Sequence, residues 1–408
     1  MLIYRLLISL VGPLLWAHRI WRASGAVEAI WPAQPTKSDG KTLWVHAASN
    51  GEITSAKPLL VALLGQSPDL NLLITVNTPS AVKAAREWDL PRTQVTYAPI
   101  DLRWRIARLI DALDPAAILI VENEFWPNKI VLAQDRGLPV LVAGARLSKT
   151  SARRWRFLPR LARRMTQAIT ALSPQDPASA ERFCALGLPA DKQLPELNLK
   201  LFYTAPEVTA PPTNRAQTIL AASTHDGEDV QVIDAFAAAY RLNPKLRLIV
   251  APRHPRRASA IIEAAKRHDL ELAQRSTGAT FDADTAIWLA DTMGEMALWY
   301  NAAALCFVGG SLVAKGGHTP FEPAAHGMAL LTGPNIENFE PHFRALHAAG
   351  AADIVQDANA LKDAFIALPN TSKLRKMGAA AHAYHAQKGS FDPLIQAILQ
   401  KTVSKKTP

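Results

Sequence analysis

The amino-acid sequence predicts an α/β protein with two consecutive domains, each a parallel sheet wrapped by helices. Three observations support this fold class. The chain has 408 residues, whereas single hydrophobic cores stop growing at roughly 250 to 300 residues. Short apolar runs alternate with helical patterns in both halves of the chain, as they do in parallel sheets. A proline-rich segment, TAPEVTAPPTNR at 204–215, interrupts this alternation and is interpreted as the linker between the domains.

The first domain is expected over residues 32–203, opening with a linker at 32–41. Its strands are predicted by runs rich in Val, Ile and Leu, and its helices by the segments between those runs. The expected order is a strand at 43–48, a helix from Glu52, a strand at 70–76, a helix near 79–88, a strand at 94–100, a helix at 107–113, and strands at 116–123 and 138–145.

The second domain is expected over residues 216–400 and repeats the same rhythm. Neither a Walker A sequence nor a GxGxxG turn after the first strand is present, so the pattern favours neither an NTPase nor a dinucleotide oxidoreductase. The expected strands lie at 218–224, 246–254, 271–275, 286–292, 304–311 and 328–334, and the expected helices at 228–241, 256–268 and 294–302.

The first 22 residues are predicted to associate with a membrane. Residues 1–16 are largely apolar, interrupted by Arg5 and Pro13, and are shorter than the about 20 residues that a spanning helix needs. Trp16, His18, Arg19, Trp21 and Arg22 follow, an edge typical of a membrane interface. We therefore expect a membrane anchor or interfacial helix with the body of the protein in the cytoplasm. A packed amphipathic helix is the alternative, and the sequence does not say whether the helix spans the membrane or lies on it.

The net charge of +10 is concentrated in the N-terminal half. Residues 1–205 hold 25 Lys and Arg against 16 Asp and Glu, whereas residues 206–408 hold 20 against 19. The richest stretch, RRWRFLPRLARR at 153–164, fits an anionic membrane surface or a phosphorylated substrate, or is a solvated helix face. No nucleic-acid recognition motif accompanies it, so nucleic acid is not an expected partner. Cys184 and Cys306 are the only cysteines, which favours a reducing compartment.

Polar residues gather where the predicted strands end, the edge at which open parallel sheets bind ligands. In the first domain, HAASNGE (46–52) places Glu52 there, and VENEFWPN (121–128) places Glu122 and Glu124. In the second domain the corresponding stretches are ASTHDGE (222–228), PRHP (252–255), DTMGEM (291–296) and GGSLVAKGGHTPFEP (309–323). A carboxylate base in one domain and an anion-binding edge in the other predict a group transferase that works in the cleft between them.

The stretch GGHTPFEPAAHG at 316–327 combines two glycines with a helix-start pattern. Thr319 can cap a helix, Pro320 fits its first turn, and Glu322 stands where it could close a capping box. A bare loop that enters a helix suits a nucleotide phosphate. His225, His254 and His318 lack the spacing of metal ligands and are expected to be loop hydrogen-bonding residues, so no metal site is predicted.

The chain resembles the 3-deoxy-D-manno-octulosonic acid (Kdo) transferases specific for lipid A, a glycosyltransferase family. The resemblance implies a GT-B fold, two Rossmann-like domains that face each other across a cleft. It also implies inverting transfer of Kdo from CMP-Kdo to a lipid A precursor in lipopolysaccharide biosynthesis, at the cytoplasmic face of the inner membrane, without a metal or other cofactor. The resemblance is carried in order by GE (51–52), ENEFWPN (122–128), ARLS (145–148), NLK (198–200), AASTHDGE (221–228), PRHP (252–255), DTMGEM (291–296), GGSL (309–312), GGHTPFEPAAHG (316–327) and GPNIENF (333–339).

Carried over position by position, the resemblance makes Glu52 the general base and makes Glu124 and Lys200 stabilisers of the transition state. Glu322 is implied to hold ribose hydroxyls, a role that competes with the capping box. The residues implied to bind the CMP part of the donor are Pro252, Arg253, His254, Met293, Gly294, Glu295, Thr319, Pro320, Phe321 and Glu322.

Four positions depart from the family pattern, namely Asn50, Leu197, Tyr203 and Thr319. These departures leave the exact donor and acceptor open, together with the number of Kdo units and the oligomeric state. Two further interpretations therefore stay open. One is a GT-B transferase or epimerase that uses a UDP-sugar, and the other is a lipid-binding homologue without catalytic activity.

Overall fold

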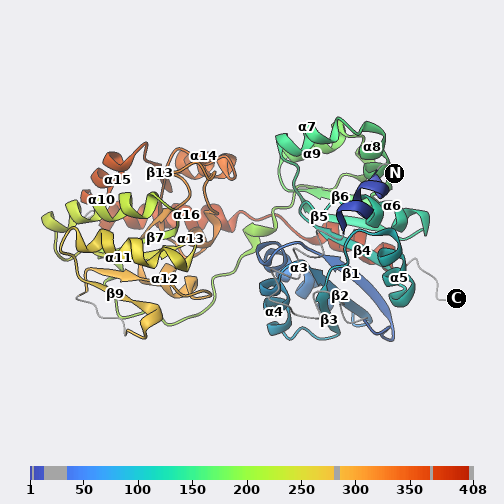
Figure 1. The fold of residues 1–408 in the computed structure, drawn as a ribbon, viewed down its shortest axis with the longest axis horizontal. Coiled ribbons are helices and arrows are strands. Elements are labelled where there is room, and N and C mark those ends of the chain that lie inside the picture. Colours follow the sequence, from blue (N-terminus) through green and yellow to red (C-terminus); the bar gives the residue numbers. More distant parts are fainter. Residues whose placement is uncertain (2–3, 13–34, 280–284, 368–370, 404–408) are drawn as a thin grey trace. The chain divides into compact units, whose positions relative to one another are not determined.

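A computed structural model describes residues 1, 4–12, 35–279, 285–367 and 371–403 (Figure 1). The chain divides into two compact units. The first contains Met1–Phe202 together with Lys388–Pro408, and the second contains Tyr203–Gln387. Each unit is built around one parallel sheet with helices between successive strands, which confirms the predicted α/β class.

The first unit has a six-stranded parallel sheet in the order β3-β2-β1-β4-β5-β6. Alternate residues of β1 and β2 enter two separate cores, with Leu43, Val45 and Ile74 on one face of the sheet and Trp44 and Leu73 on the other. The strands are β1 Lys41–His46, β2 Leu70–Val76, β3 Thr93–Tyr97, β4 Ala117–Val121, β5 Val140–Ala145 and β6 Ala171–Pro174. The helices are α3 Asn50–Gln66, α4 Pro79–Glu87, α5 Arg103–Leu113, α6 Pro127–Asp135, α7 Lys149–Trp155, α8 Pro159–Ala168, α9 Pro177–Ala185 and α17 Asp392–Val403, with a short 3₁₀ turn η2 at Leu199–Phe202.

The described part of the N-terminal segment is a helix over residues 4–12 that packs on the first unit. The Tyr4 hydroxyl donates to Asp101 at 2.8 Å, and Arg5 donates to Asn128 at 3.3 Å. Leu6, Leu7 and Leu10 on the same helix are exposed. Most of the predicted anchor, including its aromatic and basic edge at 16–22, lies outside the described residues. No helix within the described ranges is long and apolar enough to cross a membrane.

The second unit has a seven-stranded parallel sheet in the order β13-β12-β11-β7-β8-β10-β9. Its strands are β7 Thr218–Thr224, β8 Arg247–Pro252, β9 Leu272–Gln274, β10 Ile287–Leu289, β11 Leu305–Val308, β12 Ala329–Thr332 and β13 Ala352–Ile354. Its helices are α10 Glu228–Leu242, α11 Ala258–Lys266, α12 Met296–Ala302, α13 Phe321–Ala325, α14 Glu340–Ala348, α15 Ala358–Ile366 and α16 Thr371–Ala386.

The C-terminal boundary of the second domain differs from the one predicted. The sequence assigned residues 216–400 to that domain, but the chain leaves the second unit after Gln387. Helix α17 then adds Leu394, Ile395 and Ile398 to the core of the first unit. The predicted linker at 204–215 belongs to the second unit by its contacts, where the Thr213 hydroxyl donates to the Ala302 carbonyl at 2.7 Å.

Candidate functional site

The carboxyl edge of the first sheet brings Glu52, Glu122 and Glu124 together. Glu52 lies in the first turn of α3. The N-cap of this helix, Ser49, lies in the short turn after β1 and accepts a hydrogen bond from the Glu52 N–H. Glu122 and Glu124 follow β4, the strand that pairs with β1. Parallel pairing of these two strands therefore places the two loops at one edge, as the sequence predicted.

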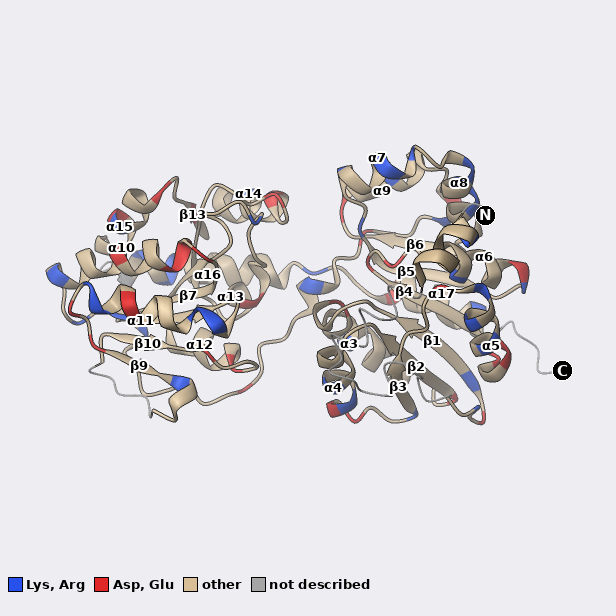
Figure 2. Cartoon of the chain, viewed as in Figure 1, with Lys and Arg blue, Asp and Glu red and all other residues tan. Residues whose placement is uncertain are grey.

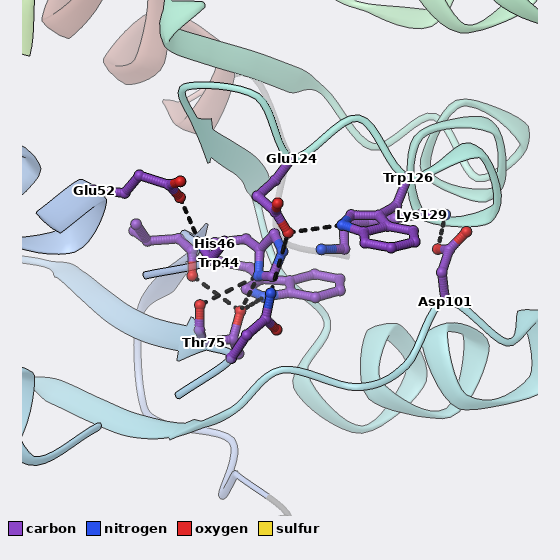
Figure 3. A network of polar contacts seen from close by, with 11 residues as sticks. Trp44, His46, Glu52, Thr75, Asp101, Glu124, Trp126 and Lys129 are labelled. Atoms are coloured by element: carbon purple, nitrogen blue, oxygen red, sulfur yellow. Dashed lines mark hydrogen bonds and ion pairs between the residues drawn. The ribbon is translucent and has the colours of Figure 1, made fainter. Parts of the chain in front are cut away.

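Glu52 is poised to change its protonation state near neutral pH. The Ala48 N–H donates to Oε2 of Glu52 at 2.6 Å, which holds the carboxyl against the end of β1 (Figure 3). Burial raises the pKa of Glu52 to about 7, and the charges of Glu122 and Glu124 add to this rise. The Ala48 hydrogen bond and the charge of Lys200 act in the opposite direction. A carboxyl group with this pKa can accept a proton under physiological conditions, which an ordinary glutamate does poorly.

Glu124 is held as a fixed anion. Three donors converge on its Oε2 atom, namely His46 Nε2 at 3.1 Å, Asn77 Nδ2 at 3.2 Å and Trp126 Nε1 at 2.7 Å (Figure 3). Burial by itself raises the pKa of this carboxyl, but the hydrogen bonds from His46 and Trp126 outweigh it and lower the pKa to about 2. Glu124 therefore differs from Glu52 in role, because it keeps its charge and does not take up protons near neutral pH.

His46 is a neutral donor in this network. It is fully buried, and burial together with the charge of Lys129 lowers its pKa to about 4. Its Nδ1 faces the Thr75 hydroxyl at 3.0 Å, and the Trp44 indole N–H donates to that hydroxyl at 2.8 Å. A neutral ring that donates from Nε2 to Glu124 is an acceptor at Nδ1. The Thr75 hydroxyl has one hydrogen, which it shares between that atom and the Val45 carbonyl oxygen at 3.2 Å.

Lys200 is fixed beside the carboxylates by an ion pair. Its Nζ lies 2.8 Å from Oε1 of Glu122, which is buried. Lys200 belongs to the 3₁₀ turn η2, and Glu122 has a φ of +55°, so the chain turns sharply at the end of β4. Strain of this kind in a non-glycine residue is often found at functional sites.

A buried lysine, Lys129, lies next to Trp44 in this network. Lys129 in α6 is 1% exposed, and its Nζ lies 5.5 Å from the centroid of the Trp44 ring. Burial lowers the pKa of Lys129 to about 8, whereas the charges of Glu124 and Asp101 raise it. Asp101 accepts the backbone N–H groups of Asn128 and Lys129 at 2.8 Å each, and so caps α6 from another loop.

Histidine and arginine side chains gather at the carboxyl edge of the second sheet. His225 follows β7, Arg253 and His254 follow β8, and His318 lies in the loop after β11. The Nε2 atoms of His225 and His318 are 2.9 Å apart and the two rings lie within 7° of parallel, so one ring donates and the other accepts. Gly310 permits this approach, because a Cβ there would lie 3.1 Å from the His318 ring. Arg253 and His254 are exposed at this edge.

Glu228 organises the backbone of that edge. It is fully buried, and its carboxylate accepts the N–H groups of Gly310, Ser311 and Leu312 at 2.6 to 2.9 Å and that of His225 at 3.1 Å. These bonds tie the loop after β11 to the start of α10. Glu228 is the last residue of ASTHDGE, and its role was not predicted from the sequence.

Four other residues predicted to bind CMP lie at the ends of two neighbouring strands, β8 and β10. Met293, Gly294 and Glu295 form a turn after β10, where Met293 is 70% exposed and Gly294 has a φ of +91°. Glu295 pairs with Arg275 at 2.7 Å and accepts a hydrogen bond from the Thr292 hydroxyl. Pro252 ends β8 and is buried.

The predicted helix start at Thr319 is wrong. Helix α13 begins at Phe321 with Pro320 as its N-cap, and the cap makes no side-chain hydrogen bond. Thr319 accepts only a long hydrogen bond, 3.4 Å, from the Phe321 N–H. Glu322 bonds instead with the Tyr300 hydroxyl, and burial raises the pKa of Glu322. A buried carboxyl group with a tertiary partner has no need of the local capping geometry.

Phe321 and three of the four positions that depart from the family pattern make contacts within their own units. Phe321 is buried and packs edge-on against Phe339 and His342, so its side chain belongs to the core. Leu197 is buried in the core of the first unit. The Tyr203 hydroxyl lies 3.2 Å from His326 Nε2, and Asn50 Oδ1 accepts from Thr54 at 3.4 Å. In the described parts of the chain, no three or more His, Cys, Asp or Glu side chains are arranged to hold a metal ion.

Comparison with known proteins places the chain among transferases. A family model described as 3-deoxy-D-manno-octulosonic-acid transferase (kdotransferase) matches residues 18–203. The chain is 33% identical over 350 residues to the 3-deoxy-D-manno-octulosonic acid transferase of Haemophilus influenzae, covering 83% of this chain and 82% of that protein. It is 31% identical over 415 residues to the enzyme of the same name from Bordetella pertussis, covering 94% and 95%.

Solved structures share the fold at low sequence identity. The UDP-GlcNAc 2-epimerase of Neisseria meningitidis has a TM-score of 0.60 and 12% identity, covering 90% of this chain and all of that one. MurG of Acinetobacter baumannii has a TM-score of 0.54 and 15% identity, covering 88% and 99%. At this identity the likeness shows the fold alone, and it confirms the predicted GT-B class.

Proposed function

Because the chain belongs to the 3-deoxy-D-manno-octulosonic acid (Kdo) transferase family, we propose that it moves Kdo from CMP-Kdo to a lipid A precursor in lipopolysaccharide biosynthesis. The observation that carries the proposal is the pair of unlike carboxyl groups at the edge of the first sheet. Glu52 has a pKa of about 7, whereas Glu124 is a permanent anion with three donors. An inverting transfer needs one carboxylate that accepts a proton and others that only stabilise charge.

In the proposed reaction, Glu52 removes the proton from the acceptor hydroxyl as that oxygen attacks the anomeric carbon of Kdo. The attack comes from the face opposite the phosphate, so the new C–O bond forms while the bond to the phosphate oxygen breaks. CMP leaves with the electron pair of that bond, and the configuration at the anomeric carbon inverts. Glu124 stabilises the positive charge that develops on the sugar, and Lys200, held by Glu122, offers a cation to an anionic group of the substrates.

The CMP part of the donor is proposed to bind at the edge of the second sheet. The Arg253 side chain makes no ion pair or hydrogen bond with another described residue and is exposed after β8, so its guanidinium can take a phosphate. Glu322 is proposed to accept hydrogen bonds from ribose hydroxyls. This role fits a carboxyl group that is not used to cap α13.

The experiment that tests this function supplies the purified full-length protein with CMP-Kdo and a tetraacylated lipid A precursor and weighs the products by mass spectrometry. We expect the acceptor to gain the mass of one or more Kdo units. We also expect CMP, and not UMP or UDP, to raise the melting temperature of the protein. Protection by UDP alone would favour a UDP-sugar enzyme, and normal lipid binding without product would favour a homologue that is not catalytic.

We further propose that the protein works at the cytoplasmic face of the inner membrane. Exposed Leu6, Leu7 and Leu10 and the arginines of α7 and α8 support this location (Figure 2). Deleting residues 1–22 should release much of the protein from membranes while both units stay folded. Each arginine at an anionic surface adds up to about 1 kcal/mol of attraction, so partial retention at low salt is expected. Full sedimentation of the truncated protein in high salt would contradict the proposal.

A further inference from the structure

A pocket of about 280 Å³ opens at the loop after β4, the loop that carries Glu122 and Glu124. Asn123, which lies between Glu122 and Glu124 in the chain, forms part of its wall, together with Arg146 and Ser151. Phe125 and Trp155 supply an apolar side. The volume is near the lower end of the roughly 300 to 1,000 Å³ that small-molecule sites occupy. The pocket therefore has room for one charged group and part of the molecule that bears it.

Arg146 gives the pocket its charge. It directly follows β5, and its backbone N–H donates to the Glu122 carbonyl at 3.3 Å, which fixes it next to the loop with the carboxylates. No side chain among the described residues forms an ion pair or hydrogen bond with its guanidinium. Arg182 nearby behaves differently, because its guanidinium donates to the Leu147 carbonyl at 2.7 Å. An arginine that lines a pocket beside the site without a protein carboxylate is suited to an anion of a ligand.

The Ser151 hydroxyl adds a hydrogen-bond donor to the pocket. Ser148 accepts the Ser151 N–H at 3.1 Å, and its own hydroxyl donates to Ser151 Oγ at 3.1 Å. This arrangement leaves the Ser151 hydroxyl hydrogen to point to a ligand. A guanidinium fork and a hydroxyl donor together match the oxygens of a phosphate group better than a neutral sugar hydroxyl.

The surroundings favour an anion that is part of a larger, partly apolar molecule. Arg153 and Arg154 on α7 are exposed, and Figure 2 shows basic residues along α7 and α8. The apolar wall continues inward, where Phe125 packs on Phe183 with ring centroids 5.0 Å apart. Free phosphate would use the charge but not this wall.

We propose that this pocket binds a phosphate group of the acceptor and thereby sets which acceptor hydroxyl reaches Glu52. The inference rests on the proposed function, because that function supplies a phosphorylated lipid as acceptor. Arg146 acts here as a binding residue that selects the acceptor, and it takes no part in the proton transfer.

The test compares Arg146→Ala and Arg146→Lys with Arg103→Ala, which removes an exposed arginine of α5 outside the pocket. The probes are a soluble diphosphorylated disaccharide acceptor and the same disaccharide with a phosphate removed. We expect the wild type to bind the phosphorylated probe about ten- to hundredfold more tightly by calorimetry. Arg146→Ala should lose this preference, Arg146→Lys should keep part of it, and Arg103→Ala should behave as wild type.

Several results would overturn the inference. One is an Arg146→Ala variant that still prefers the phosphorylated probe as the wild type does. Another is an equal loss in Arg103→Ala, which would point to surface charge in general. Inorganic phosphate that competes with CMP-Kdo and not with the acceptor would assign the pocket to the donor. The Ser151→Ala variant provides a second measurement if Arg146→Ala does not fold, as judged by CMP protection in a thermal shift.

Calorimetry needs no turnover, so the two proposals can fail separately. If the wild type binds the phosphorylated probe through Arg146 but yields no product with CMP-Kdo, the pocket stands and the proposed function fails. If product forms and the phosphate preference does not depend on Arg146, the function stands and the pocket assignment fails.

Discussion

The carboxyl edges of the two sheets share a backbone plan but differ in how their charges are balanced. In the first unit, the loops after β1 and β4 carry Glu52, Glu122 and Glu124, and these carboxylates receive hydrogen bonds or an ion pair from the protein itself. In the second unit, the loops after β7, β8 and β11 carry His225, Arg253, His254 and His318. Burial lowers the pKa of His225, and the charges of His254, Lys315 and Arg253 lower it further.

This difference indicates that the edge of the first unit is organised before the substrates bind. The first edge has its donors and carboxylates in place, so it is organised in advance for proton transfer and charge stabilisation. The second edge presents the exposed guanidinium of Arg253 among histidines whose pKa values are lowered, and its buried carboxylate, Glu228, is occupied by backbone N–H groups. An anionic ligand would supply the missing negative charge there.

The largest effect is expected for Glu52→Gln. Glutamine keeps the shape of the side chain and can still accept the Ala48 hydrogen bond, but it cannot take the proton of the acceptor hydroxyl. Loss of a general base commonly lowers the rate by about 10² to 10⁴. Initial rates should fall by this order while CMP affinity, set by the second unit, stays near wild type. A variant that keeps more than about a tenth of the wild-type rate would make Glu52 structural and Glu122 or Glu124 the candidate base.

Glu124→Gln should have a smaller effect on the rate, about 10 to 10²-fold, because it removes a fixed charge and not the base. Glutamine can still accept hydrogen bonds from His46 and Trp126, so the loop should keep its position. The control is Trp126→Phe, which removes one donor and leaves the charge. If both variants reduce the rate equally, the role of Glu124 is to hold the loop in place.

The dependence of the rate on pH should report Glu52. A raised pKa means that the folded protein holds this proton more tightly than a free glutamate does, so the active carboxylate is lost as the pH falls below about 7. We expect kcat/KM to fall about tenfold per pH unit below that point, whereas an ordinary glutamate would keep the rate flat to about pH 5. The charge of Glu124 raises the pKa of Glu52, so Glu124→Gln should move the acid limb to lower pH.

The alternation of apolar runs was enough to predict both sheets, since most strands are short, apolar and separated by helices. Strands β6 and β13 were missed. ALSP has only two apolar residues and ends in proline, and ADI is only three residues long. The return of α17 to the first unit could not be predicted, because the strands it contacts, β4 and β6, lie more than 200 residues away in the sequence. No local pattern encodes such a contact.

The candidate site was predictable where one residue at a strand end suffices, as for Glu52 and Glu124. The supporting residues were missed because their roles arise from pairing between strands. His46 ends β1, Asn77 follows β2 and Glu124 follows β4, and only the order β2-β1-β4 brings them together. The cap at Thr319 was wrong for a related reason, because Glu322 has a tertiary partner, Tyr300, that a local pattern cannot show.

The smallest effect is expected in the second unit, for Glu322→Gln. Glutamine can accept one hydrogen bond in place of a carboxylate but is a weaker acceptor for ribose hydroxyls, so CMP affinity should fall about three- to tenfold. Stability should change little, since Glu322 does not cap α13. Tyr300→Phe is the matched control, because it removes the hydroxyl that bonds with Glu322 and leaves the carboxyl group. Calorimetry with CMP and thermal melting separate the outcomes. Unchanged affinity together with a melting temperature lowered by the loss of about 1 kcal/mol would show that Glu322 stabilises the fold and does not bind the donor.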